Sequence, residues 1–183
     1  MASPEKFIPY GRQTITEEDI ASVVNILRSP YLTQGPAVTE FEKEVSSRVK
    51  AKHGVAVNSA TSALHIACLA LGIGPGKRLW TSPITFVATS NSAMYCGAKP
   101  IFSDINEDTI NLCPEKLKET LNAHPNTKAI IPVHFSGAPC KMKEIQKIAK
   151  SKNLIVIEDA AHALGAKYED GSKIGSCKYS DMT

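Results

Sequence analysis

The chain has 183 residues, of which 43% are hydrophobic and 21% are charged, a composition typical of a folded globular protein. Its net charge of +3 is too small to indicate a nucleic-acid-binding surface. No window approaches the ~20 apolar residues of a transmembrane helix and the N-terminus lacks an apolar signal core, so we expect a cytoplasmic protein without a membrane partner. The five cysteines show no C-x-x-C spacing, which favours reduced thiols over disulfides or a zinc site.

Two amphipathic helices are expected at the start of the chain. Thr16, followed three residues later by Asp19, is typical of a helix N-cap, and apolar residues at helical spacing continue to the break at Pro30. A second helix is expected over residues 36–49, after a polar and aromatic loop. We therefore expect residues 1–53 to form an N-terminal helical segment that carries this loop.

From residue 54 onward, short apolar runs alternate with helical patterns. Such alternation predicts βαβ units and a mainly parallel sheet, and hence an α/β domain over residues 54–183. The expected strands lie at residues 55–57, 79–81, 100–103, 129–135 and 154–158. The expected helices lie at about residues 60–71, 86–96, 114–121 and 142–149.

The last of these strands is followed by two carboxylates. Four apolar residues, Leu-Ile-Val-Ile, precede Glu158 and Asp159, and His162 follows shortly after. Ligands of open α/β sheets bind at the carboxyl ends of the strands. A buried carboxylate needs a favourable partner, and a protonated heterocyclic nitrogen would serve Asp159 well. A helix N-cap or a structural salt bridge is the alternative interpretation.

Two other loops could contact the same ligand. The turn Asn-Ser-Ala-Thr-Ser at 58–62 offers backbone N–H groups and hydroxyls to a phosphate, or simply caps a helix. Phe86 follows another strand and could stack on a flat ligand or belong to the core. His134 could face the site, although a satisfied core histidine is the favoured interpretation. The fingerprints of dinucleotide and nucleoside-triphosphate sites are absent, and no metal site is indicated.

A phosphate turn, an aromatic ring, an acid and a histidine are together what pyridoxal phosphate requires. The chain resembles the DegT-type nucleotide-sugar aminotransferases, which are pyridoxal-phosphate enzymes of the aspartate-aminotransferase fold (fold type I). The matching segments occur in family order: Ile-Pro-Tyr-Gly at 8–11, Leu-Thr-Gln-Gly-Pro at 32–36, Asn-Ser-Ala-Thr-Ser-Ala-Leu at 58–64, Thr-Ser-Pro-Ile-Thr-Phe-Val-Ala at 81–88, Val-His-Phe-Ser-Gly at 133–137 and Ile-Glu-Asp-Ala-Ala-His-Ala-Leu-Gly at 157–165.

The resemblance implies a three-layer α/β/α large domain whose strands, numbered in chain order, are arranged 3-2-4-5-6-7-1. It also implies a set of cofactor contacts: Ala60, Thr61 and Ser62 to the phosphate, Phe86 on the pyridine ring, Asp159 to the ring nitrogen and His162 to the phenolic oxygen. The residues implied for the sugar-nucleotide pocket are Tyr10, Pro30, Tyr31, Leu32 and Thr33.

Within the family, the Leu-Thr-Gln-Gly motif and His162 are most similar to the transaminases of pseudaminic acid biosynthesis. That similarity implies a homodimer that transfers an amino group from glutamate to C4 of a UDP-linked 4-keto-6-deoxy-N-acetylhexosamine.

The family's Schiff-base lysine corresponds to a position beyond Thr183, so we expect residues 1–183 alone to be inactive. The sheet is expected to be truncated within its sixth strand and the C-terminal small domain to be absent. Strand 55–57 would then lack its neighbour and expose an apolar edge, which favours aggregation or partial disorder. Two alternatives to an aminotransferase stay open: an inert remnant or binding fragment, and a pyridoxamine-phosphate-dependent sugar dehydratase with histidine in place of the lysine.

Overall fold

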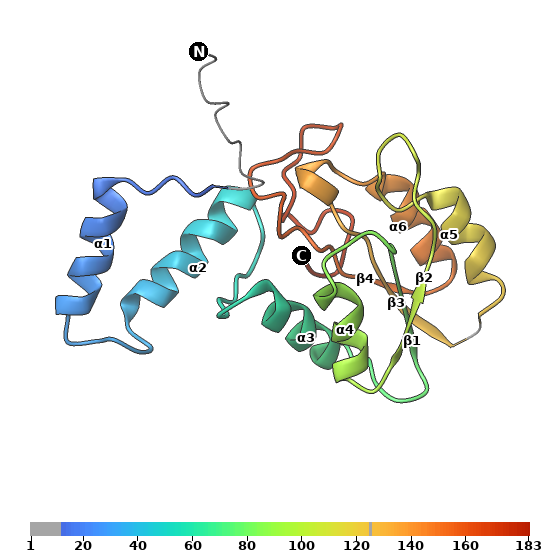
Figure 1. The fold of residues 1–183 in the computed structure, drawn as a ribbon, viewed down its shortest axis with the longest axis horizontal. Coiled ribbons are helices and arrows are strands. Elements are labelled where there is room, and N and C mark those ends of the chain that lie inside the picture. Colours follow the sequence, from blue (N-terminus) through green and yellow to red (C-terminus); the bar gives the residue numbers. More distant parts are fainter. Residues whose placement is uncertain (1–11, 125) are drawn as a thin grey trace, which may run out of the picture. The chain divides into compact units, whose positions relative to one another are not determined.

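The computed structural model of the protein describes residues 12–124 and 126–183 (Figure 1). Contacts divide the chain into two compact units, Met1–Phe41 and Glu42–Thr183. The division lies within helix α2 (Pro36–Val49), earlier than the boundary expected after residue 53. The boundary after residue 53, which separates the expected helical segment from the expected cofactor-binding domain, stays a prediction.

The first unit contains helix α1 (Glu17–Arg28), which begins as the sequence predicts. Thr16 and Asp19 form a reciprocal capping box: the Asp19 backbone N–H donates to Thr16 Oγ1 over 3.2 Å, and the Thr16 N–H donates to Asp19 Oδ2 over 2.8 Å. Ser29 caps the other end, directly before Pro30. The expected helix 36–49 is also confirmed, with Pro36 at its first position.

The second unit is built on a four-stranded parallel sheet. The strands are β1 (Arg78–Thr81), β2 (Lys99–Phe102), β3 (Thr127–Ile131) and β4 (Ile155–Val156), and they lie in the order β2-β1-β3-β4. Counted as in the expected sheet, where residues 55–57 are strand one, this is the order 3-2-4-5. The α/β class and this part of the strand order are confirmed.

Helices cover both faces of the sheet (Figure 1). On one face, α5 (Pro114–Leu121) and α6 (Met142–Ser151) bury Leu117 and Ile145 against Ile130 of the central strand β3. On the other face, α3 (Ala60–Ala70) and α4 (Ala88–Tyr95) cover side chains of β1 and β3 that point to the side opposite Ile130, because successive side chains of a strand alternate in direction. This is the three-layer arrangement that the resemblance implies.

The predicted strand at residues 55–57 is wrong. Val55 is 81% exposed and Val57 is 37% exposed, and no strand in the described ranges pairs with them. The Ala56 N–H donates instead to the Glu42 side chain over 2.8 Å. An apolar run becomes a strand only where a neighbouring strand satisfies its backbone groups, and this segment has no such neighbour here.

Two other strands are shorter than expected. β3 ends at Ile131, because Pro132 has no N–H to donate to a ladder and Phe135–Gly137 then forms a 3-10 turn. β4 is regular only over Ile155–Val156, and isolated parallel bridges then join Ile157 to Met182 and Val133 to Asp159. These bridges continue the sheet pairing as far as Asp159, the acid that the sequence singles out.

Over the described ranges, no helix combines the length and apolar character needed to cross a bilayer.

Candidate functional site

Asp159 lies where the chain leaves β4, at the carboxyl edge of the sheet, and is 8% exposed. Backbone hydrogen bonds hold it on both sides: its N–H donates to the Pro132 carbonyl over 2.9 Å, and its carbonyl accepts from the His134 N–H over 3.0 Å. The position of the carboxyl group is therefore fixed by the sheet rather than by a free loop.

Neutral groups hold the Asp159 carboxyl group. Thr89, which is fully buried on α4, donates its hydroxyl to Asp159 Oδ2 over 2.7 Å, and the Ala161 N–H donates to Oδ1 over 3.2 Å. Among the described residues, no lysine, arginine or histidine forms an ion pair with Asp159. A nearly buried carboxylate without a protein cation is suited to a positively charged ligand group.

Thr89 is a site residue that the sequence analysis missed. Its hydroxyl also lies 2.8 Å from Oγ1 of Thr85, which precedes α4, so Thr85 contacts the threonine that supports the acid. Thr89 is the second residue of α4 and follows Phe86 by three residues, but nothing local in the sequence distinguishes it from other threonines.

Replacing Thr89 by valine, which keeps the shape and removes the hydroxyl, is expected to weaken pyridoxal phosphate binding about fivefold. The physical reason is the loss of one hydrogen bond that orients Asp159, worth ~1 kcal/mol. Thr89→Ser keeps the hydroxyl and is the matched control. Absorbance titration of the apoprotein measures both affinities, and a Thr89→Val affinity equal to that of Thr89→Ser would contradict the assignment.

Phe86 presents an exposed ring beside this helix. Its side chain is 73% exposed, which excludes the core interpretation for this residue, and its carbonyl accepts from the Thr89 N–H over 3.1 Å. The ring and the threonine that supports the acid are therefore held by the same turn of the chain. Its expected stacking role stays a prediction.

The turn at 58–62 caps α3. Ser59 is the N-cap and accepts from the Ser62 N–H over 3.2 Å, while the Ser62 hydroxyl donates to Asn58 Oδ1 over 2.7 Å. The capping interpretation is thus confirmed, and the donors of Ser62 are used within the turn. The backbone N–H groups of Ala60 and Thr61 belong to the first helical turn, where the helix itself offers no acceptor. These two N–H groups are the better candidates for a phosphate.

For the remaining predicted site residues, no described contact joins their side chains to Asp159. His162 is exposed in the loop after Asp159, and Gly137 (φ +83°) passes so near that an added Cβ would lie 3.0 Å from the His162 carbonyl oxygen. The loop residues Pro30, Tyr31, Leu32 and Thr33 are exposed within the first unit. Tyr10 lies outside the described residues. The roles expected for all of these residues stay predictions.

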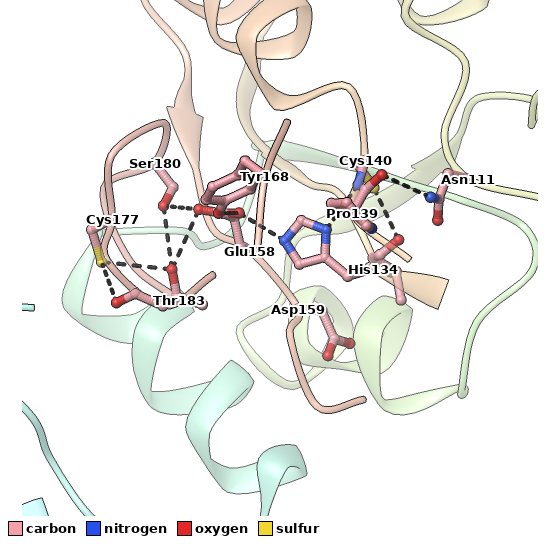
Figure 2. Close-up of polar contacts among 12 residues, drawn as sticks. Asn111, His134, Pro139, Cys140, Glu158, Asp159, Tyr168, Cys177, Ser180 and Thr183 are labelled. Atoms are coloured by element: carbon pink, nitrogen blue, oxygen red, sulfur yellow. Dashed lines mark hydrogen bonds and ion pairs between the residues drawn. The ribbon is translucent and has the colours of Figure 1, made fainter. Parts of the chain in front are cut away.

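His134 is fully buried, as the core interpretation expected, and its Nε2 lies 2.7 Å from Glu158 Oε2 (Figure 2). Figure 2 shows the Asp159 carboxyl group pointing away from the cluster around Glu158. Of the two adjacent acids, only Asp159 carries a role predicted from the sequence. No group of three potential metal ligands occurs within the described part of the chain.

The sequence profile of the DegT/DnrJ/EryC1/StrS aminotransferase family matches residues 13–182. The chain belongs to this family. It is 47% identical over 163 residues to the spore coat polysaccharide biosynthesis protein SpsC of Bacillus subtilis (strain 168), a match that covers 89% of this chain and 41% of SpsC.

Solved structures of aminotransferases share the fold. The putative sugar aminotransferase Spr1654 of Streptococcus pneumoniae, in its PLP form, matches with a TM-score of 0.88 at 31% identity, over 95% of this chain and 47% of its own. Helicobacter pylori PseC, an aminotransferase involved in the biosynthesis of pseudoaminic acid, matches with a TM-score of 0.87 at 31% identity, over 93% of this chain and 45% of its own. The chain therefore spans less than half the length of each of these relatives.

Proposed function

We propose that these residues form the cofactor-binding part of a pyridoxal-phosphate-dependent aminotransferase. In this proposal the enzyme transfers an amino group from glutamate to C4 of a UDP-linked 4-keto-6-deoxy-N-acetylhexosamine. Family membership supports the reaction class, and the PLP form of Spr1654 supports the cofactor.

The observation that carries the proposal is the environment of Asp159. The carboxylate is nearly buried, is held by two neutral donors and lacks a cationic side chain among the described residues. A protonated pyridine nitrogen supplies the missing positive charge. In return, the negative charge of Asp159 favours the protonated form of that nitrogen.

The other site residues suit the same ligand. Ala60 and Thr61 would bind the phosphate through backbone N–H groups, with Ser62 near it, and the exposed ring of Phe86 would cover one face of the pyridine. His162 would hydrogen-bond the phenolic oxygen. When bound, pyridoxal phosphate acts as an electron sink for the carbon that carries the amino group. The residues named here bind it, orient it and hold a proton at its ring nitrogen.

The substrate proposal rests on relatives and on motifs. SpsC is named for polysaccharide biosynthesis, and PseC for the biosynthesis of pseudoaminic acid. In the proposal, Tyr10 and the loop from Pro30 to Thr33 contact the sugar nucleotide, the enzyme is a cytoplasmic homodimer, and glutamate is the amino donor. Residues 1–183 alone are expected to be inactive, because none of their lysines corresponds to the family's catalytic lysine.

The test uses the product of the whole open reading frame that encodes these residues, purified without cofactor. Added pyridoxal phosphate is expected to give the visible absorption of a protein-bound cofactor, and glutamate with the UDP-4-keto sugar is expected to give the 4-amino sugar by mass spectrometry. A deoxygenated sugar without amination would instead support the dehydratase alternative. The absence of both cofactor binding and product would contradict the proposal and would favour an inert protein.

A further inference from the structure

The geometry points to Glu158 as a positioning residue for this site. We infer that its buried carboxylate fastens the segment 168–183 to the end of β4 and so places Ser180 and Thr183 beside the strand end that carries Asp159. This inference rests on the proposed function, because it assigns Glu158 a role in the cofactor site.

Glu158 and Asp159 are consecutive but serve opposite faces of the sheet. Successive side chains of extended backbone alternate in direction, so Asp159 turns toward Thr89 on α4 while Glu158 turns toward Tyr168 and His134. Glu158 is 2% exposed. A carboxylate this deeply buried does not itself touch a ligand, and any effect it has on the site passes through its partners.

The Glu158 carboxylate accepts from several neutral donors at once (Figure 2). The Tyr168 hydroxyl and His134 Nε2 lie at Oε2, while the Ser180 hydroxyl and, over 3.4 Å, the Thr183 hydroxyl lie at Oε1. Burial alone would raise the pKa of Glu158, but the hydrogen bonds from His134, Ser180 and Tyr168, with a smaller electrostatic effect from His134, outweigh burial and hold its pKa below the ordinary value. The lowered pKa favours the charged carboxylate form of Glu158.

The tautomer of His134 follows from its second hydrogen bond. The Cys140 N–H donates to His134 Nδ1 over 3.1 Å, so Nδ1 carries a lone pair and the ring proton is on Nε2, facing Glu158. His134 thus acts as a neutral donor. The same surroundings make the Cys140 thiol inert: burial, with a smaller effect from the Glu158 charge, raises its pKa to about 12.

The main chain shows what this cluster holds in place. The Glu158 N–H donates to the Met182 carbonyl over 2.8 Å, and the Asp181 N–H donates to the Val156 carbonyl over 2.8 Å. The side chain of Glu158 reaches Ser180 and Thr183 on either side of this contact. Ser180 is partly buried and Thr183 is exposed, so neither side chain is enclosed by the cluster as Glu158 is.

The test compares three variants of the whole-gene product. Glu158→Leu removes every acceptor. Glu158→Gln keeps the shape, because its amide oxygen can accept from His134 and Tyr168 while its NH2 group donates to Ser180, whose hydroxyl can rotate. Glu169→Gln changes an exposed glutamate in the same loop and is the matched control.

Two readouts are used. The first is the Kd for pyridoxal phosphate per folded molecule, and the second is hydrogen exchange at the Asp181 amide in the apoprotein. Glu158→Leu is expected to raise both Kd and exchange rate by about tenfold or more, equivalent to the loss of one or two net hydrogen bonds. Glu158→Gln is expected to restore both to within about threefold of wild type, and Glu169→Gln to change neither.

The outcomes separate the two proposals. If Glu158→Leu shows faster exchange but an unchanged Kd, the role of Glu158 in the wild-type protein is structural only, which overturns the inference. Unchanged exchange overturns it as well, whatever the cofactor does. A wild-type protein that binds no pyridoxal phosphate overturns both the inference and the proposed function, whereas normal wild-type binding with an unchanged Glu158→Leu Kd overturns the inference alone. If Glu158→Leu does not fold, Ser180→Ala replaces it, and an unchanged Kd in that variant overturns the inference.

Discussion

Replacing Asp159 by asparagine is expected to weaken pyridoxal phosphate binding by about 10- to 100-fold and to reduce turnover at least as much. The lost interaction is a hydrogen bond between two charged groups in a nearly buried site, worth ~1.5–3 kcal/mol. Turnover falls further because an uncharged partner no longer favours the protonated ring nitrogen on which the electron-sink chemistry depends.

The fold is expected to survive this change. The asparagine Oδ1 can still accept from the Ala161 N–H, and its NH2 group can donate to Thr89. The Thr89 hydroxyl can then turn to donate to Thr85, since that contact works in either direction. The variant therefore loses charge while Thr89 and Ala161 each keep a hydrogen bond to the side chain.

Absorbance titration and steady-state kinetics on the whole-gene product measure the two effects, and thermal unfolding checks the fold. Asp108→Asn, which neutralises an exposed aspartate, is the matched control and is expected to behave as wild type. An Asp159→Asn protein that keeps wild-type affinity and turnover would make Asp159 a purely structural acid.

The second large effect concerns the centre of the sheet. Ile130→Ala is expected to lower the free energy of unfolding by ~2–5 kcal/mol, because it opens a cavity that the surrounding side chains only partly fill. Ile130 is fully buried on β3, in register with Trp80 on one side and Val156 on the other. The strands that carry the site are held together across this residue.

Urea unfolding of the apoprotein measures this loss. Ile66→Ala makes the same chemical change on α3 at a side chain that is 49% exposed, and is expected to cost ~1 kcal/mol or less. Similar losses in the two variants would mean that the sheet core contributes less to stability than its burial indicates.

Much of the second unit could be predicted from the sequence because its local and tertiary signals agree. The alternation of apolar runs and helical patterns is confirmed in β1 to β4. In the first unit, the N-cap predicted at Thr16 is confirmed as well. The segment 55–57 shows the limit: its apolar residues suit a strand, but a strand forms only where a neighbour pairs with it, and no strand of the described ranges pairs with this segment.

The site divides in the same way. Asp159 could be found because an acid directly after a buried strand is conspicuous in a sequence. Thr89 and Glu158 could not be found in this way, because their importance lies in contacts with residues far along the chain. Thr89 contacts Asp159, 70 residues away, and Glu158 contacts His134, 24 residues away. A threonine in a short helix and a glutamate beside an aspartate look ordinary until the fold brings their partners to them.

The adjacency of Glu158 and Asp159 also restricts how this protein can change during evolution. A single-residue insertion between Ile155 and Glu158 would move Glu158 to the position that faces Thr89, and a deletion there would move Asp159 to the position that faces His134 and Tyr168. Both acids would then be misplaced at once, although the composition would barely change. Loops elsewhere tolerate changes in length, but here the site depends on the register of the strand, which decides which face each acid occupies.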